Sequence, residues 1–394
     1  EGWWAAFGLQ SGEPVYGLGE KWGALNKRGQ LVTSVALDAL GVNGEDSYKS
    51  TPFAWSPAGW GVFTHTTAIV NHGVGFGQWS HRSYAVQVAD SVMDLFLIEA
   101  DTPAAMLARY TDLTGRAPAL PRWSLGVWLS RCYYRTADEA LEAAQGMRDR
   151  GIACDVITLD GRAWLKLEER FAFVWDEERY PDPAAFVAKI KALGFRLCVW
   201  EYPYVSIQAP LFPWLEAQGY LLKEADGRTA VRGWEQDTFG EILTPLPPSS
   251  AIDFTNPDAY AWWAEKHREL FDVGVDVMKT DFGEHVPLEV VASNGETGRR
   301  LHNVYPLLYN RCVYEATAKW GPSGPLVWGR AGWTGSQRYP VQWGGDLQGD
   351  WEGLAASIRG GLSWGMSGVP FHTHDIRSEE HTSELQSPLN ISYA

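Results

Sequence analysis

The chain has 394 residues, a formal net charge of −15 and an isoelectric point of about 5.1. This length accommodates two domains with large buried cores, whereas the acidic balance argues against a nucleic-acid partner, because binding phosphates requires clustered Lys and Arg. No run of apolar residues is long enough to span a bilayer, so we expect no membrane partner either.

The first part of the chain, residues 1–118, has the pattern of an all-β domain. Short apolar runs alternate with turn residues in segments such as GVFTHTTAIV and YAVQVADSVMDLFLIEA. This pattern is typical of a β-sandwich. A short helix is expected at residues 103–113, and the segment APALPRW, with Pro118 and Pro121, predicts a domain boundary. The opening EGWWAAFGLQ contains no start Met or signal-like stretch, so we expect the sequence to begin inside this domain, and a lost signal peptide stays open.

From residue 119 to residue 376, apolar strands mostly alternate with amphipathic helices. Strands are expected at residues 124–132, 154–160, 195–203, 275–282, 325–330, 340–346 and 368–375, and helices at residues 136–151, 182–194, 256–274, 303–321 and 350–365. Because these strands are largely apolar, both of their faces are covered, which favours parallel βα units. No Gly-rich dinucleotide loop follows a strand. The pattern therefore favours a (β/α)8 TIM barrel without its last unit over a doubly wound sheet.

Polar residues collect where the predicted strands end: Asp160, Glu201, Asp281, Arg330, Asp346, His374 and Asp375. The carboxyl ends of the strands form the catalytic face of a TIM barrel. A capping or ion-pair role explains any one of these residues equally well. Their joint occurrence at strand ends indicates an active site.

Two of these residues suit the cleavage of glycosidic bonds. That reaction needs one carboxyl to protonate the leaving oxygen and a second one to attack the sugar or activate water. Asp281 and Asp346 follow predicted strands with one other strand between them, so we expect both at the same barrel mouth. A separation of roughly 5–5.5 Å between the carboxyl groups would give retention, and roughly 6.5–9.5 Å inversion; the sequence leaves this open.

Residues beside the two aspartates support this hypothesis. Lys279 lies two positions before Asp281 and shares its face of the strand, where a cation keeps a carboxylate ionised. Gly344 and Gly345 permit a tight turn before Asp346. Arg330 suits sugar hydroxyls or a carboxylate, and a buried ion pair is the alternative.

Aromatic residues are abundant, with 21 Trp, 16 Tyr and 15 Phe. Aromatic side chains fill large cores, but they also stack on the flat C–H patches of pyranose rings, and both interpretations stay open. The four cysteines, Cys132, Cys154, Cys198 and Cys312, form no C-x-x-C pair, so we expect no zinc site. The first three lie in apolar runs and are expected to be buried free thiols. The compartment stays open, with the cytoplasm favoured.

Several segments together resemble glycoside hydrolase family 31, which contains α-glucosidases and α-xylosidases. They are MKTDFGEHVP, RYPVQWGGD, HDI, YGLGEKWGALNKRG, YKSTPFAWSPAGWGVF, AIDFTNPDA and SIRGGLSWGMSG. The resemblance extends over most of residues 12–376 and is greatest to the bacterial α-xylosidase-like branch. It implies a retaining double displacement on an oligosaccharide or other α-glycoside, without metal or organic cofactor.

The resemblance also implies roles for individual residues. Asp281 of KTDFGE corresponds to the nucleophile and Asp346 of WGGD to the acid/base. Asp160, at the end of the second strand, corresponds to the residue that binds the distal sugar hydroxyls. The other residues that resemble pocket residues are Trp200, Lys279, Glu284, Arg330, Trp343, Phe371 and His374.

Departures from the family pattern fall where substrate specificity is set. The second-strand loop reads DGRAWLKLEERFAFVWD, the third strand ends WEYPYV where WINPYI is common, and AGWTGSQ follows Arg330, which puts Trp333 near the expected pocket. Glucose and xylose therefore both stay open, as do galactose and a sulfonated sugar. A transglycosylase, a non-catalytic carbohydrate-binding homologue and a homo-oligomer are further alternatives.

The last residues, RSEEHTSELQSPLNISYA, are polar and lack periodicity. They look like a translated sequencing-adapter oligonucleotide, so residues 377–394 are interpreted as a non-native tail, with an ordinary disordered tail as the alternative. We expect the natural chain to continue past Ile376. Because the last barrel unit would then be missing, open strand edges predict that the 394-residue chain is poorly soluble or inactive.

Overall fold

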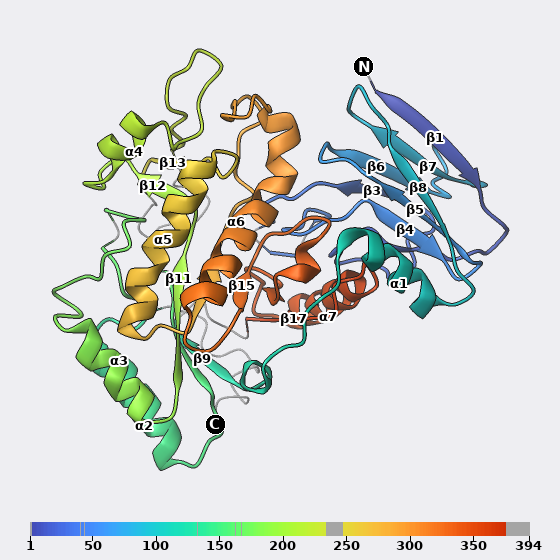
Figure 1. Cartoon of the computed structure of the whole chain (residues 1–394). Coiled ribbons are helices and arrows are strands. Elements are labelled where there is room, and N and C mark those ends of the chain that lie inside the picture. The colour runs from blue at the N-terminus through green and yellow to red at the C-terminus, as the bar shows by residue number, and fades with distance from the viewer. Residues whose placement is uncertain are drawn as a thin grey trace. The chain divides into compact units, whose positions relative to one another are not determined.

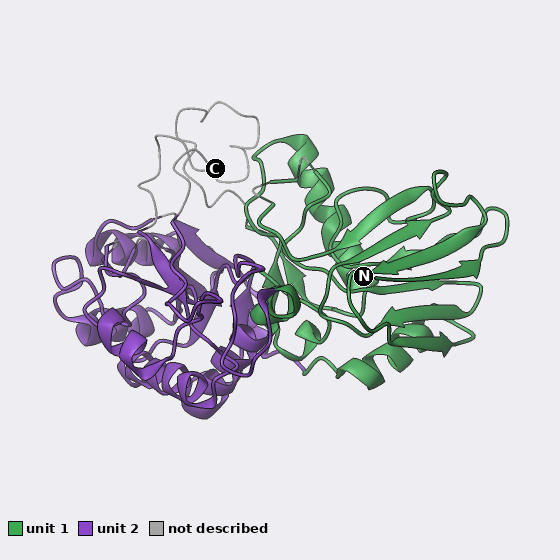
Figure 2. Cartoon of the chain, turned by 90° about the horizontal axis from the view of Figure 1, so that it is seen from above, with its two compact units in different colours: residues 1–118, 299–307, 330–394 green, residues 119–298, 308–329 purple. Residues whose placement is uncertain are grey.

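The computed structural model describes residues 2–39, 41–42, 44–131, 133–161, 163–166, 168–233 and 247–375. The chain divides into two compact units, coloured separately in Figure 2: unit 1 comprises residues 1–118, 299–307 and 330–394, and unit 2 comprises residues 119–298 and 308–329. The domain limits drawn from the sequence stay a prediction. The interpretation of residues 377–394 and the burial expected for Cys132 fall outside the described residues.

Unit 1 contains the predicted β-sandwich. Two antiparallel sheets have the strand orders β1-β7-β6-β3 and β2-β4-β5-β8 (Figure 1). The strand bounds are β1 Trp3–Gly8, β2 Tyr16–Gly17, β3 Gln30–Ser34, β4 Phe53–Ser56, β5 Trp60–Thr64, β6 Val70–Val74, β7 Ser83–Val88 and β8 Leu95–Glu99. Helix α1, Pro103–Thr114, follows where the sequence predicts it, and the Thr102 side chain caps it by accepting from Ala105 N.

The sandwich core is built from alternate residues of facing strands. Along β7 the side chains of Tyr84, Val86 and Val88 lie on one face and are buried, whereas on the other face Gln87 is exposed and Ala85 is buried. Both sheets contribute to one apolar cluster, which includes Val32, Ala54, Val62, Val70, Val74, Tyr84, Val86 and Val88.

Unit 2 holds five parallel strands in the order β15-β14-β11-β10-β9. Their bounds are β9 Trp128–Arg131, β10 Val156–Leu159, β11 Arg196–Glu201, β14 Val277–Thr280 and β15 Val327–Gly329. All four residues of β10 and all four of β14 are buried, as expected for strands covered on both faces. Residues 122–125, which overlap the first predicted strand, form a short 3-10 helix instead.

Four of the predicted helices begin one residue after their predicted first residue, whereas the helix predicted at residues 303–321 begins five residues earlier, at Gly298. Their bounds are α2 Ala137–Asp149, α3 Pro183–Ala192, α5 Pro257–Val273, α6 Gly298–Trp320 and α7 Trp351–Gly365. Thr136, Asp182 and Asn256 accept backbone N–H groups at the starts of α2, α3 and α5. Gly274 adopts a left-handed conformation directly after α5.

Three short elements after β11 were not predicted. They are β12 Tyr204–Ser206, α4 Phe212–Gln218 and β13 Ser249–Ala251, with β12 and β13 paired antiparallel. Segments this short contain too few residues for a hydrophobic period to show.

The barrel strands of unit 1 are β16 Gln342–Trp343 and β17 His372–Thr373, which pair in parallel. Together with the five strands of unit 2 they supply seven of the eight strands of a (β/α)8 barrel among the described residues. The predicted fold class, an incomplete TIM barrel preceded by an all-β sandwich, is confirmed. No helix in the part of the chain that the structure describes is long and apolar enough to cross a bilayer.

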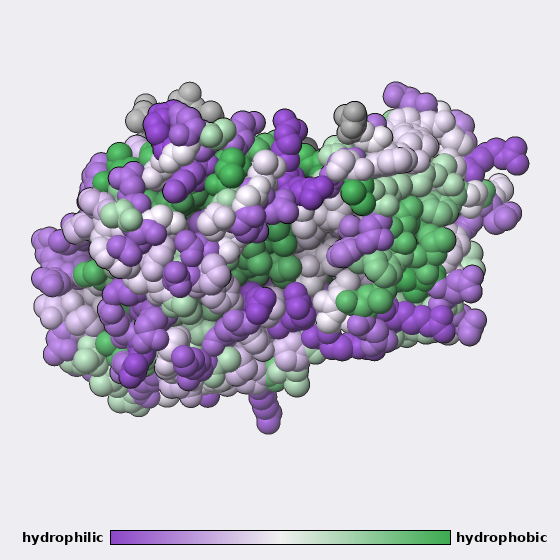
Figure 3. Space-filling model, turned by 45° about the horizontal axis from the view of Figure 1, so that its top comes forward, coloured by the Kyte–Doolittle hydropathy of each residue, from purple (hydrophilic) through white to green (hydrophobic). Residues whose placement is uncertain are grey.

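Apolar side chains are exposed in unit 1. Figure 3 shows a hydrophobic area, in green, over the sandwich. On α7 the side chains of Trp351, Leu354, Ile358 and Leu362 are exposed at intervals of three or four residues, which places them along one stripe of the helix. Exposed apolar surface of this kind promotes association in solution, and the poor solubility expected from the sequence stays a prediction.

A buried histidine makes the sandwich sensitive to acid. His72 on β6 has no exposed surface, and its Nε2 and Nδ1 lie 3.0 Å from Ser34 Oγ and 2.9 Å from Tyr84 Oη. Burial, with a smaller contribution from Lys21, lowers the pKa of His72 from 6.5 to about 3. His72 is therefore neutral in the folded chain under conditions where it is protonated in the unfolded chain.

We predict that His72→Gln reduces the acid sensitivity of folding. Between pH 6.5 and about 3 the unfolded chain binds a proton at His72 that the folded chain does not, so stability falls with falling pH, by at most about 1.4 kcal/mol per pH unit. Urea midpoints at pH 7 and pH 4.5 should differ less in His72→Gln than in the parent. The exposed His65→Gln should behave like the parent, and an equal shift in all three proteins would contradict the assignment.

Candidate active site

The residues predicted for the site fall in both units. Unit 2 contains Asp160, Trp200, Lys279, Asp281 and Glu284, and unit 1 contains Arg330, Trp343, Asp346, Phe371 and His374. The contacts within each unit are described in turn below for unit 2 and then for unit 1.

Asp281, the candidate nucleophile, directly follows β14 and is held by three hydrogen bonds. Trp200 Nε1 donates to its Oδ2 over 2.7 Å, and the backbone N of Phe282 donates to its Oδ1 over 2.8 Å. Its own backbone N donates to the Glu201 carbonyl over 2.9 Å. Because both carboxylate oxygens and the backbone are held, the carboxylate has a fixed orientation, which a reacting group needs.

The turn after Asp281 has an uncommon backbone conformation. Phe282 has φ 58° and Gly283 φ 104°, and positive φ at a bulky residue such as Phe282 marks strain of the kind that collects at functional sites. The buried Tyr204 hydroxyl accepts from Gly283 N and His285 N over 3.3 and 3.2 Å. Burial raises the pKa of Tyr204, so this hydroxyl stays protonated.

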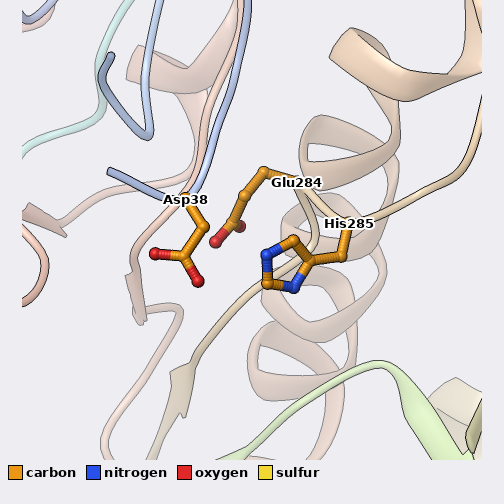
Figure 4. Close-up of side chains that lie close together, drawn as sticks. All are labelled: Asp38, Glu284 and His285. Atoms are coloured by element: carbon orange, nitrogen blue, oxygen red, sulfur yellow. The ribbon is translucent and has the colours of Figure 1, made fainter. Parts of the chain in front are cut away.

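Glu284 lies on the same segment, next to His285 (Figure 4). Its side chain is buried. The structure thus places the predicted pocket residue Glu284 three positions after the candidate nucleophile, on a segment whose backbone Tyr204 holds.

Asp160 and Lys279 form a buried ion pair at the ends of β10 and β14. Lys279 Nζ lies 2.7 Å from Asp160 Oδ2 and 4.7 Å from the centre of the Trp328 ring. Gly161 N donates to Asp160 Oδ1 over 2.8 Å. The Lys279 ammonium pairs with Asp160, and the effect on Asp281 that the sequence suggested stays a prediction. The pair presents a fixed carboxylate and ammonium beside an aromatic ring, groups that suit sugar hydroxyls.

In unit 1, Asp346 follows β16 and is partly exposed, with 31% of its side chain accessible. Arg330 Nη1 donates to its Oδ2 over 3.1 Å, and its backbone N donates to Tyr48 Oη over 3.3 Å. The Arg330 guanidinium also lies 4.7 Å from the Tyr48 ring centre. Arg330 therefore makes the ion pair that the sequence offered as one alternative.

A second buried cluster holds the strands on either side of Asp346. Lys49 Nζ donates to the Trp343 carbonyl over 2.6 Å and lies 2.8 Å from Glu20 Oε2, while Glu20 Oε1 lies 3.0 Å from His372 Nε2. Burial raises the pKa of Glu20, but Lys49 and His372 outweigh it and the net shift is downward. Glu20 is therefore an anion that joins Lys49 to β17.

His374 lies beside this cluster, with its ring centre 4.6 Å from that of His372. Burial and His372 lower the pKa of His374 to about 4. Its imidazole is thus neutral near pH 7 and suits hydrogen bonding to an uncharged ligand. Phe371 is half-buried and immediately precedes β17.

Tyr48, Glu20 and Lys49 were not picked out from the sequence. They lie 294 to 352 residues before their partners, and no local period reveals such contacts. The available signal was two family-like segments: YGLGEKWGALNKRG contains Glu20, and YKSTPFAWSPAGWGVF begins with Tyr48 and Lys49.

Two further residues make contacts that the sequence did not predict. Trp333, expected near the pocket, is buried and donates its indole N–H to the Thr66 carbonyl of the sandwich over 3.2 Å. Glu201, grouped with the polar strand ends, turns its side chain to His267 on α5. Glu201 ends β11 as the sequence predicts, and the place of Trp333 near the pocket stays a prediction.

Two family models match the chain. Residues 117–385 match the model described as glycosyl hydrolases family 31 TIM-barrel domain, and residues 3–71 match the glycosyl hydrolase 31 N-terminal galactose mutarotase-like domain. These matches agree with the resemblance noted in the sequence.

Curated relatives include α-xylosidases. The chain is 36% identical over 386 residues to an α-xylosidase of Emericella nidulans, covering 96% of this chain and 47% of that protein. It is 34% identical over 373 residues to the α-xylosidase XylQ of Lactiplantibacillus pentosus, covering 92% of this chain and 46% of that protein. The chain thus spans about half the length of these relatives.

Solved structures share the fold. The cycloalternan-degrading enzyme from Trueperella pyogenes, in complex with a covalent intermediate, superimposes with a TM-score of 0.83 at 25% identity. The superposition covers 95% of this chain and 55% of that one.

We predict that Gly345→Ala disrupts the turn that carries Asp346. Gly345 has φ +76°, and an added Cβ would lie 2.1 Å from Tyr48 Cε2, so the turn or the ring must move. The positive φ alone costs roughly 1–2 kcal/mol, and the urea midpoint of the variant should fall accordingly. Gly349→Ala is the matched control, because an added Cβ there meets nothing within 4 Å; equal midpoints for both variants would contradict the prediction.

Proposed function

Because the chain belongs to family 31 of the glycosyl hydrolases, we propose that it carries both catalytic aspartates of a retaining α-glycosidase. The observation that carries this proposal is the fixed carboxylate of Asp281, held by Trp200 Nε1 on one oxygen and Phe282 N on the other. A nucleophile in a displacement at carbon needs such an orientation before the substrate binds.

The proposed reaction has two steps. In the first, a carboxylate oxygen of Asp281 attacks the anomeric carbon while Asp346, as the acid, gives its proton to the departing glycosidic oxygen. The product is a glycosyl ester on Asp281 and a free alcohol. In the second, Asp346 takes a proton from water as the water oxygen attacks the same carbon, which restores both carboxyl groups and releases the sugar.

Other residues are assigned to binding. The Asp160–Lys279 pair offers an acceptor and a donor to sugar hydroxyls, and the neutral His374 offers a further polar contact. Arg330 holds the Asp346 carboxylate in place. Trp200, Glu284, Trp343 and Phe371 complete the proposed pocket.

The proposed sugar is a terminal α-linked xylose, with glucose as the alternative. Two relatives at 34–36% identity are α-xylosidases, which supports xylose. The structural relative that contains a covalent intermediate supports the double displacement. We propose water as the acceptor in the second step, with a second sugar as the alternative acceptor. Product analysis with an added sugar acceptor distinguishes hydrolysis from transfer.

We predict that substitutions of the two aspartates lower kcat of the full-length protein to different extents. Asp281→Asn should lower kcat for an aryl α-xyloside by at least about 10³-fold, because the bond-forming group is lost, whereas Asp346→Ala should lose about 10²–10⁴-fold, and less for aryl groups that leave without a proton. Steady-state rates with activated and unactivated aryl α-xylosides, α-glucosides and α-galactosides measure both effects and the sugar preference.

The control is Asp272→Asn, an exposed carboxylate on α5, which should leave all rates unchanged. Full turnover by Asp281→Asn would overturn the proposal and favour the non-catalytic binding homologue, whose ligand binding would not depend on either aspartate.

A further inference from the structure

Glu201 and His267 form a buried pair behind the candidate nucleophile. Glu201 ends β11, His267 lies on α5, and neither side chain has exposed surface. Glu201 Oε2 and His267 Nε2 are 2.6 Å apart. Glu201 Oε1 is buried without a hydrogen-bond partner in the described part of the chain.

The hydrogen bonds around His267 fix the proton count of the pair. His267 Nδ1 lies 2.7 Å from the Trp263 carbonyl, which only accepts, so Nδ1 carries a proton. The short contact between Nε2 and Oε2 then requires one more proton, on either the imidazole or the carboxyl group. In both arrangements the pair as a whole is neutral, which makes its complete burial tolerable.

Aromatic rings shield the pair from water. Phe173 and Trp263 meet the His267 ring edge-on at centroid distances of 5.1 and 6.1 Å, and Phe271 stacks on it at 6.2 Å. A buried polar contact in such surroundings is directional and rigid. The unpartnered Oε1 shows that this arrangement is not the least costly way to fill the space.

The pair is connected to Asp281 through the backbone. Trp200 and Glu201 are adjacent residues of β11, so their side chains point to opposite faces of the strand. Trp200 donates to Asp281 Oδ2, and the Glu201 carbonyl accepts from Asp281 N over 2.9 Å. One dipeptide therefore holds both the carboxylate and the backbone of Asp281, and the Glu201 side chain fastens that dipeptide to α5.

We propose that Glu201 and His267 are positioning residues for the nucleophile: by joining the end of β11 to α5, they fix the Trp200–Glu201 segment that orients Asp281. This inference rests on the proposed function of Asp281. Neither residue touches the sugar. They act on kcat, because a displaced Asp281 carboxylate is no longer oriented to attack the anomeric carbon in the transition state.

The test compares three substitutions in the full-length protein. Glu201→Leu removes the link, while Glu201→Gln keeps it, because the amide donates to a neutral Nε2. The double variant Glu201→Leu/His267→Leu removes both partners and leaves neither of them buried without the other, so we expect it to fold even if the single variant does not. Asp276→Asn is the matched control, since Asp276 is a buried carboxylate at the opposite end of β11, where it accepts from Leu197 N over 2.7 Å.

We expect both Leu variants to lose at least about tenfold in kcat, per folded molecule, with KM for the aryl glycoside within about threefold of the parent. Glu201→Gln should retain most of the activity, and Asp276→Asn should change stability without changing kcat. Circular dichroism and thermal unfolding measure the folded fraction. A merely structural role would change that fraction and leave kcat per folded molecule unaltered.

The possible failures are distinguishable. If Asp281→Asn is inactive but the double Leu variant keeps the parent kcat, the positioning role is wrong and the proposed function stands. If Asp281→Asn retains full turnover, the proposed function itself has failed.

Discussion

The hydrogen bond from Trp200 Nε1 to Asp281 Oδ2 is the interaction on which the site in unit 2 depends. It exists because β11 and β14 are parallel neighbours whose register places Trp200 opposite Lys279 and Glu201 opposite Thr280. A shift of this register by one residue would turn Trp200 away from Asp281. The same register brings the Glu201 carbonyl to the backbone N of Asp281. Strand pairing, rather than any local motif, thus creates the geometry that the proposed nucleophile needs.

In unit 1, Asp346 is held both by Arg330, 16 residues before it, and by Tyr48, 298 residues before it. Two segments that link sandwich strands supply the more distant contacts. Tyr48 binds the backbone of Asp346, Lys49 the carbonyl of Trp343 and Glu20 the imidazole of His372. All these groups belong to one compact unit. The sandwich is therefore more than a neighbouring domain, since its loops position the two short strands β16 and β17.

Much of the fold was predictable because its signals are local. Apolar runs predicted each barrel strand that the structure describes. Capping residues such as Thr136, Asp182 and Asn256 predicted the starts of α2, α3 and α5. Asp281 and Asp346 stood out because they follow such strands. The sequence did not reveal α4, β12 and β13, whose few residues carry no period. It also did not reveal the pairing of Lys279 with Asp160, which lies 119 residues away along the chain. Glu201 was noticed as unusual, but its link to His267 depends on how α5 packs on β11, which no spacing rule gives.

The central claim is that Asp281 forms a covalent bond to the sugar, and chemical trapping tests it most directly. A 5-fluoroglycosyl fluoride forms the glycosyl-enzyme quickly, because fluoride is a good leaving group, and slows its hydrolysis by destabilising the positively charged transition state. After incubation of the full-length protein with this reagent and proteolysis, mass spectrometry should find the fluorosugar on the peptide that contains Asp281, with fragmentation placing it on that residue. Inactivation with the label on a different side chain, or turnover without any covalent species, would contradict the account.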